Sequence, residues 1–294
     1  MTFMKAYLIT MFSAFCIILF MRKLFFHKNY DLNKFSTAKG LVDIEEINKN
    51  VFNIFDEWQK VADNGLTIDP PKEIPKPTEF LLNNYTRLEY YYWNQTPKNT
   101  NLTLEYWNQT YIDNLVKAAK INPSKVPLSY LDECLSVYTA TKHFGIKDKI
   151  GAVIGSQQPW AEVFLLANGV KHITTVDYYQ LSINHPKMDF LYAPDLPLKK
   201  EKYYGKFDFI VAFSSIEHSG LGRYGDPIDP IGDIREMNKI HCMLKPNGLL
   251  YLGFSVGVDK IAYNAHRIYG RMRLAMMFEG LLFLFRWLST KNLF

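Results

Sequence analysis

Four short apolar runs between residues 150 and 254 constrain the fold more than any other feature of this chain. They are Ile150–Gly155, Ile173–Asp177, Phe207–Phe213 and Leu249–Phe254, and helical patterns such as Trp160–Asn168 lie between them. Apolar runs of this length are typical of strands that are buried on both faces. Their alternation with helices predicts an α/β fold: a doubly wound, mainly parallel sheet with helices on both faces.

Two of these runs end on residues that suit a nucleoside ligand. Gly155 ends the first run, and Asp177 ends the second run 22 residues later. Sheets of this class bind ligands at the carboxyl ends of their strands, where a glycine admits the ligand and an acid accepts hydrogen bonds from ribose hydroxyls. Alone, the glycine would suit any tight turn, and the aspartate would suit any exposed position. Together they favour a nucleoside site.

The order of these elements resembles that of the class I S-adenosylmethionine-dependent methyltransferases. Segment Asp195–Leu198 is similar to the one that follows their third strand. Segment Ser214–His218 resembles the Leu-Glu-His ending of their fourth strand, and Met243–Gly248 resembles the Leu-Lys-Pro-Gly-Gly turn before their fifth. More narrowly, Glu217–Pro227 and Asn264–Gly270 resemble an uncharacterised methyltransferase-like family described from Caenorhabditis.

The resemblance implies a cofactor, S-adenosylmethionine, and a set of site residues. The cofactor-binding residues would be Gly155, Ser156, Asp177, Asp195 and Ser214. His218 would be a general base, or a residue that only orders the strand end. The substrate-binding residues would be Glu217, Arg223, His266 and Arg267, although structural ion pairs are an equal alternative for the two arginines.

Two departures from the methyltransferase pattern stand out. The loop Gly155–Pro159 reads Gly-Ser-Gln-Gln-Pro and lacks the second and third glycines of the usual motif. Only about forty residues follow the fifth run, which leaves doubtful room for the two further strands that end the usual sheet. A last apolar stretch, Leu274–Leu288, predicts a late strand or a core-facing helix.

The amino terminus predicts a membrane anchor. Residues 6–21 are almost uninterruptedly apolar, with Lys5 before them and Arg22-Lys23 after them, and no small-residue cleavage pattern follows. We therefore expect an uncleaved signal-anchor over residues 1–23, an extension over 24–124 and the methyltransferase-like domain over 125–294. The protein would be a single-pass membrane protein, in the endoplasmic reticulum or Golgi.

The side of the membrane depends on two opposed signals. Basic residues after the apolar stretch weakly favour a cytosolic domain. Four N-glycosylation sequons, at Asn84, Asn94, Asn101 and Asn108, cluster within about 25 residues and favour a lumenal glycoprotein.

The extension also contains a predicted amphipathic helix over residues 42–61 and a near-repeat, residues 88–96 and 104–110, which we interpret as a duplicated loop or hairpin. An aromatic carbohydrate platform is an alternative interpretation of the repeat.

Composition excludes several other classes. The net charge of +5 comes without a dense Lys/Arg block, so no nucleic-acid partner is expected. The three distant cysteines form neither a disulfide framework nor a zinc spacing. Asp226, Asp229 and Asp233 could hold a cation, but Asp-Pro is turn chemistry and Asp233 suits a helix N-cap, so no metal is predicted.

The sequence therefore predicts a methyltransferase that acts on a hydroxyl or similar nucleophile of a small-molecule or glycan acceptor. Two alternatives stay open. One is a non-catalytic, membrane-tethered module with the same fold. The other is a secretory-pathway sugar transferase, although no Asp-x-Asp motif is present.

Overall fold

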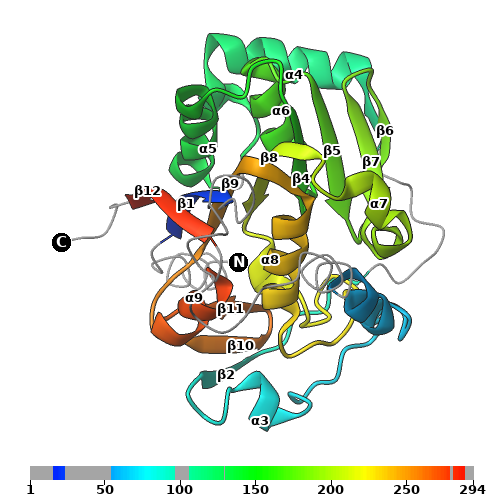
Figure 1. The fold of residues 1–294 in the computed structure, drawn as a ribbon, viewed down its shortest axis with the longest axis vertical. Helices are drawn as coiled ribbons and strands as arrows, with labels where there is room; N and C mark the ends of the chain where they lie inside the picture. The colour runs from blue at the N-terminus through cyan, green and yellow to red at the C-terminus, as the bar shows by residue number, and fades with distance from the viewer. Residues whose placement is uncertain (1–15, 24–53, 97–105, 129, 279–280, 289–294) are drawn as a thin grey trace, which may run out of the picture.

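The protein is described by a computed structural model that covers residues 16–23, 54–96, 106–128, 130–278 and 281–288. Its centre is a seven-stranded sheet with the strand order β12-β1-β9-β8-β4-β5-β7 (Figure 1). A three-stranded sheet, β11-β10-β2, and a two-stranded sheet, β3-β6, complete the β-structure of these residues.

Five neighbouring strands of the large sheet are parallel and correspond to the predicted core. Ile150 pairs with His172 and Gly151 with Phe209, so the first two apolar runs lie in adjacent parallel strands, as predicted. The fold is thus a mainly parallel sheet with flanking helices. The five strands are β4 (Ile150–Ile154), β5 (His172–Asp177), β7 (Met188–Tyr192), β8 (Phe207–Phe213) and β9 (Leu244–Ser255).

Alternate residues of these strands enter two separate hydrophobic clusters, one on each face of the sheet. Val153 and Val211 pack with Phe164 of a helix on one face, whereas Ile210 packs with Met237 of a helix on the other. Both faces are therefore covered, which explains why the strands are apolar throughout. The first face carries α4 (Gln109–Ile121), α5 (Leu131–Phe144) and α6 (Trp160–Ala167), and the second carries α7 (Lys200–Tyr203), α8 (Gly232–Met243) and the helix over residues 54–62.

The outer two strands of the large sheet come from opposite ends of the chain. Strand β1 (Cys16–Lys23) runs antiparallel between β9 and β12 (Leu281–Leu288), and β12 is attached to the sheet through β1. A late strand was one of the two predictions for the last apolar stretch, and it is confirmed for Leu281–Leu288. The sheet thus gains two outer strands although few residues follow β9, because the amino-terminal segment supplies one of them.

The predicted anchor overlaps this arrangement. Its last part, Cys16–Met21, lies in β1, and residues 6–15 are outside the described residues. Within the described part of the chain, no helix has the length and apolarity to cross a bilayer. The anchor is therefore not confirmed and stays a prediction, as does the membrane location.

The small sheet lies at one end of the molecule, beyond α8 (Figure 1). It contains β2 (Arg87–Tyr91), β10 (Lys260–Asn264) and β11 (His266–Ile268), and β2 runs parallel to β10. The second copy of the near-repeat instead forms β3 (Tyr106–Asn108), which pairs with β6 (Ser182–Asn184). The strands of the two copies therefore pair with segments distant in sequence, and the interpretation as a duplicated loop or hairpin stays a prediction.

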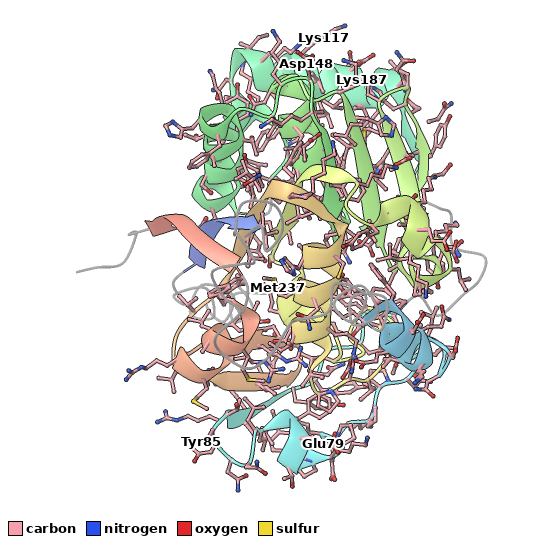
Figure 2. All side chains as sticks on the ribbon, viewed as in Figure 1. Glu79, Tyr85, Lys117, Asp148, Lys187 and Met237 are labelled. Carbon is pink, nitrogen blue, oxygen red and sulfur yellow. The ribbon has the colours of Figure 1, made fainter. Side chains whose placement is uncertain are left out.

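The carboxyl ends of the parallel strands point toward this small sheet. Asp148 and Lys187 precede β4 and β7, and Figure 2 places both at the end of the molecule opposite to Glu79 and Tyr85, with Met237 between them. The remaining short elements are α3 (Pro77–Phe80), α9 (Arg271–Met277) and the 3-10 turns η2 (Pro123–Lys125), η3 (Ala193–Asp195), η4 (Pro197–Lys199) and η5 (Ile216–His218).

The packing does not separate the predicted extension cleanly from the domain. Helix α4 lies before the predicted boundary at residue 125, yet its Ile112 and Val116 share a cluster with Phe164 of α6. The helix over residues 54–62 contributes Phe55 to the core on the other face. The domain boundary stays a prediction.

Candidate functional site

The loop after β4 is held in place from two sides. Gly155 has a φ of +74°, which favours glycine, and an added Cβ would lie 2.1 Å from the Ser215 hydroxyl oxygen. The close approach of β4 to the end of β8 therefore already requires this glycine. The next amide, that of Ser156, donates to the Asp177 carboxylate at 2.6 Å.

Asp177, at the end of β5, organises the backbone around it. Its Oδ2 accepts from Ser156 N and its Oδ1 accepts from Tyr179 N at 2.7 Å. Burial raises the pKa of Asp177 to about 6, and the nearby charge of Asp226 adds to the shift. The Tyr178 amide also donates to this carboxylate. Because a carboxylate has about four acceptor positions, about one remains open.

Beneath the loop lies Glu162 of α6, an acid that is fully buried. It contacts the Ser156 hydroxyl at 3.1 Å through Oε2 and the Thr175 hydroxyl at 2.9 Å through Oε1. The same Ser156 hydroxyl is also 3.1 Å from the Gln158 carbonyl oxygen. Burial raises the pKa of Glu162 to about 7.

The number of protons available for these three hydrogen bonds fits a neutral Glu162. The Ser156 hydroxyl has one proton and cannot donate to both Glu162 and the Gln158 carbonyl. If Glu162 is protonated, it donates to Ser156 Oγ, which then donates to the carbonyl, and Thr175 supplies the last bond. All three contacts are hydrogen bonds only in that state.

Two other predicted cofactor residues have different surroundings. Asp195, in η3 after β7, forms a partly exposed ion pair with Lys199 at 3.0 Å. Ser214 follows β8 with a φ of +47°, and its amide donates to the Gly253 carbonyl at 2.8 Å. Side-chain hydrogen bonds join Ser214 to Tyr130 and to Glu217. Ser214 thus belongs to the polar cluster that follows β8.

His218 is fixed in one orientation at the end of η5. Its Nδ1 lies 2.6 Å from the Ala265 carbonyl oxygen, and only a protonated Nδ1 can bond to an oxygen that accepts. Burial and the positive charge of Arg223 lower the pKa of His218 well below its usual range. The imidazole is therefore neutral near pH 7, with its lone pair on Nε2, which has no hydrogen-bond partner among the described residues.

Arg223 lies beside this imidazole. Its NH1 donates to the same Ala265 carbonyl at 3.2 Å, and its Nε donates to Gln95 Oε1 at 2.8 Å. The guanidinium carbon is 4.5 Å from the ring centroid of Trp93 and 4.8 Å from that of Tyr224. Two of these partners, Trp93 and Gln95, belong to the first copy of the near-repeat.

Glu217, the residue before His218, is 3% exposed. Burial raises its pKa to about 7, although Arg223 opposes the shift. Its Oε2 is enclosed and has no hydrogen-bond partner in the described structure. Glu217, His218 and Arg223 therefore form a cluster in which all three side chains retain unpaired polar atoms.

A comparison with known protein families gives a match that contains most residues of this cluster. Residues 148–292 match the family described as "Caenorhabditis protein of unknown function, DUF268". This part of the chain belongs to that family. The DUF268 segment contains Gly155, Asp177, Glu217, His218 and Arg223, whereas Trp93 and Gln95 lie outside it.

Other comparisons add little. No curated protein matches the chain. A solved structure, that of the Burkholderia thailandensis 1,6-didemethyltoxoflavin-N1-methyltransferase with bound 1,6-didemethyltoxoflavin and S-adenosylhomocysteine, is similar over 65% of this chain and 86% of that chain, with 14% identity and a TM-score of 0.36. A TM-score this low carries no argument about the fold. The fold assignment therefore depends on the strand order of the sheet.

The remaining predicted substrate residues of the DUF268 segment divide into two kinds. His266 lies near His218, with their ring centroids 6.3 Å apart, and burial lowers its pKa to about 4. Arg267 is fully buried and donates to the carbonyl oxygens of Ser219, Asp229 and Pro230. Arg267 therefore fixes the loop that carries Arg223, and its predicted contact with substrate has no support here.

The three loop aspartates also have separate structural partners. Asp226 accepts from the amides of Gly220 and Gly222, and Asp229 pairs with Arg235 at 2.7 Å. Asp233 pairs with Arg273 at 2.6 Å inside α8, whose N-cap is Ile231, so the predicted N-cap role of Asp233 is wrong. Among the residues described, no group of acids, histidines or cysteines has the arrangement of a metal site.

Sequence reasoning missed Glu162, Trp93 and Gln95 as residues of the site. Glu162 had a visible signal, because it is the one acid of the apolar helix Trp-Ala-Glu-Val-Phe-Leu-Leu-Ala. Trp93 and Gln95 had only the near-repeat, which gives no indication of a partner more than a hundred residues away.

Proposed function

We propose that this protein is an S-adenosylmethionine-dependent methyltransferase that acts on a hydroxyl or similar small nucleophile. The observation that carries the proposal is the alignment of three adjacent strand ends. Asp177 ends β5, Gly155 follows β4, and a neutral imidazole with an available Nε2 follows β8. A ribose-binding acid and a base thus lie on the same edge of one sheet.

The residues at this edge partly fit the cofactor. Ribose hydroxyls donate hydrogen bonds, and about one acceptor position of the Asp177 carboxylate is left. The methionine carboxylate accepts, and the backbone amides of Gln157 and Gln158 donate to no residue that the structure describes. Those two amides would replace the missing glycines of the loop as carboxylate ligands.

The chemistry asks little of the protein beyond positioning. When bound, the cofactor would supply a methyl group activated by its sulfonium sulfur, which would leave as a neutral thioether. The acceptor hydroxyl needs to lose its proton as its oxygen forms the new bond to carbon. His218 Nε2 takes that proton, and Nδ1, held by the Ala265 carbonyl, keeps the ring in the required tautomer. Binding in line with the methyl group provides the rest of the rate enhancement.

Calorimetry of the full-length protein with S-adenosylmethionine and S-adenosylhomocysteine tests the proposal. We expect saturable binding of both, lost in Asp177→Asn because the new NH2 group has to face the donating amide of either Ser156 or Tyr179. Asp148→Asn is the matched control, since Asp148 is exposed at the opposite end of β4 and has a φ of +59° that suits Asn. Absence of binding in folded wild-type protein would refute the function.

That negative result would favour a non-catalytic module with the same fold. One observation supports this second candidate: the Ser156 amide and both Asp177 oxygens are already engaged with each other or with Tyr179. In a module that has lost its cofactor, such internal bonds would replace the ligand. Calorimetry separates the two candidates directly.

A further inference from the structure

Arg223 differs from the other deeply buried arginines in having no carboxylate partner within the described part of the chain. Arg267 and Arg273 both face Asp233, at 3.7 and 2.6 Å. Arg223 is 9% exposed, yet no carboxylate oxygen of the described residues lies within 4.0 Å of its guanidinium. Its NH2 group has no hydrogen-bond partner among these residues either. A buried cation without a counter-ion is costly, and proteins normally pair it.

The surroundings of Arg223 reduce this cost without removing it. The Trp93 and Tyr224 rings offer their π-electrons to the guanidinium, and Gln95 and the Ala265 carbonyl accept from two of its nitrogens. All four partners are neutral. Glu217, an acid whose pKa responds to the Arg223 charge, has a pKa of about 7 and is partly protonated at neutral pH, so it cancels the charge only in part.

The positive charge of Arg223 also affects the two neighbouring histidines, His218 and His266. Burial is the largest cause that lowers the pKa of His218 and of His266, the charge of Arg223 adds to both shifts, and Lys260 acts on His266 in the same direction. Both histidines are neutral near pH 7, and the field beside the predicted base comes from the Arg223 guanidinium, whose Nη1 is 3.5 Å from His218 Nδ1. This field would attract an anion and would favour the deprotonated form of an acceptor hydroxyl.

We infer that the acceptor carries an anionic group, a carboxylate or a phosphate, which binds the free NH2 edge of Arg223 while the nucleophile lies at His218 Nε2. Guanidinium groups recognise both anions through paired N–H donors. Because Arg223 NH1 and His218 Nδ1 share the Ala265 carbonyl, the anion would lie beside the base. This inference rests on the proposed methyltransferase function and narrows its substrate class.

Three probes with one ring test the charge requirement: phenyl phosphate, benzoate and the neutral benzyl alcohol. We expect calorimetry of full-length protein at constant ionic strength to show saturable binding of at least one anion and none of the alcohol. Arg223→Gln should weaken anion binding about tenfold to a hundredfold, the range for a hydrogen bond to a charged group. Arg271→Gln removes the same charge from an exposed side chain and should leave the binding unchanged.

The outcomes separate the possibilities. A preference for phenyl phosphate assigns a phosphorylated acceptor, and a preference for benzoate assigns a carboxylic acid. If wild-type protein binds neither anion better than benzyl alcohol, or if Arg271→Gln weakens binding as much as Arg223→Gln, the inference is wrong. Should Arg223→Gln not fold, the wild-type comparison still decides, and Arg223→Lys keeps the charge but not the planar fork. Titration of S-adenosylhomocysteine on the same preparation shows separately whether the methyltransferase proposal holds.

Discussion

The cofactor side and the acceptor side of the candidate site differ in how far their polar groups are satisfied. On the cofactor side, Asp177, Ser156 and Glu162 bond to one another and to the loop backbone. On the acceptor side, Glu217 Oε2 is buried without a partner and Arg223 has no counter-ion among the described residues. Buried polar groups are normally paired, so the unpaired groups of the acceptor side are candidates for contact with a ligand.

The difference also separates two kinds of rigidity. The cofactor loop is held by its own hydrogen bonds, so a ligand there has to use the lone pairs and amides that remain. The acceptor cluster stands on a buried ionic foundation, the Asp233 contacts with Arg267 and Arg273, in which Arg267 Nε and Arg273 Nη1 have no hydrogen-bond partner among the described residues. Unpaired buried atoms therefore occur in this foundation as well as in the acceptor cluster.

The largest expected effect comes from breaking that foundation. Asp233→Asn leaves two buried guanidinium groups without a full counter-charge, and removal of one partner from such a pair costs about 3–5 kcal/mol. Urea unfolding of the variant should show this loss. Glu89→Gln breaks the half-exposed pair with Lys260 and should cost about 1 kcal/mol or less. Equal costs in the two variants would mean that the acceptor side is not built on a rigid base.

A smaller, pH-dependent effect tests the cofactor side. The folded-state pKa of Glu162, about 7, lies above its ordinary value of 4.5. Between these values the folded protein holds a proton that the unfolded chain has released, so stability falls as the pH rises from about 4.5 to 7. Glu162→Gln reproduces the neutral acid, including its donation to Ser156, and removes this loss.

We therefore expect Glu162→Gln to be more stable than wild type at pH 8, on the order of 2–3 kcal/mol, and similar at pH 4. Denaturant unfolding at both pH values measures this. Glu217 and Asp177, whose pKa values are also raised by burial, keep part of the pH slope in the variant. Glu201→Gln, on an exposed side chain, should follow wild type. A variant no more stable than wild type at pH 8 would show that Glu162 is ionised at little cost.

The next effect concerns the aromatic support of Arg223. Trp93→Leu removes one of the two rings near the guanidinium, and a contact of this kind contributes about 1 kcal/mol. Tyr90→Leu, on a neighbouring exposed ring, should change stability by less than about 0.5 kcal/mol. Urea unfolding of both variants compares them. If they behave alike, the ring of Trp93 does not hold Arg223, and the acceptor side is less preorganised than the contacts indicate.

The parallel part of the sheet was predictable because each strand is apolar over its whole length. Short runs that are apolar throughout are typical of strands buried on both faces. The runs that begin at Ile150 and Ile173 are both strands. The ends of these strands then place Gly155 and Asp177 together without further information. This local regularity also explains why the edge of the sheet was assigned correctly.

The outer strands and the acceptor contacts were not predictable in the same way. The segment Cys16–Met21 is equally suited to a membrane span or to a buried strand, and its pairing with β9 joins residues more than two hundred positions apart. Arg223 and Arg267 are both arginines close to a histidine in the sequence. Only the position of Asp233 shows that one is structurally paired and the other is not.

The smallest expected effect on stability concerns the sequons. It also tests how residues 87–96 pack on the acceptor side. Asn84 has an exposed side chain. Asn94 instead donates to the Ile68 carbonyl at 3.1 Å and accepts from the Thr96 amide, and Asn108 caps α4 by accepting from Tyr111 N. A glycan is bulky and needs a solvent-facing amide. If the domain is lumenal, Asn84 is therefore the sequon of these three that we expect to carry one.

Expression in cells of an Asn101→Gln background, which removes the sequon outside the described residues, gives the measurement. Endoglycosidase treatment should shift the mobility of this protein, and the added change Asn84→Gln should abolish the shift, whereas Asn94→Gln should leave it intact. Asn84→Gln should alter stability by less than about 0.5 kcal/mol, because the side chain is exposed. Complete absence of a shift would place the domain in the cytosol. A glycan on Asn94 would show that this segment does not pack on Arg223 as described, and the contrast between the two sides of the site would then lose its aromatic support.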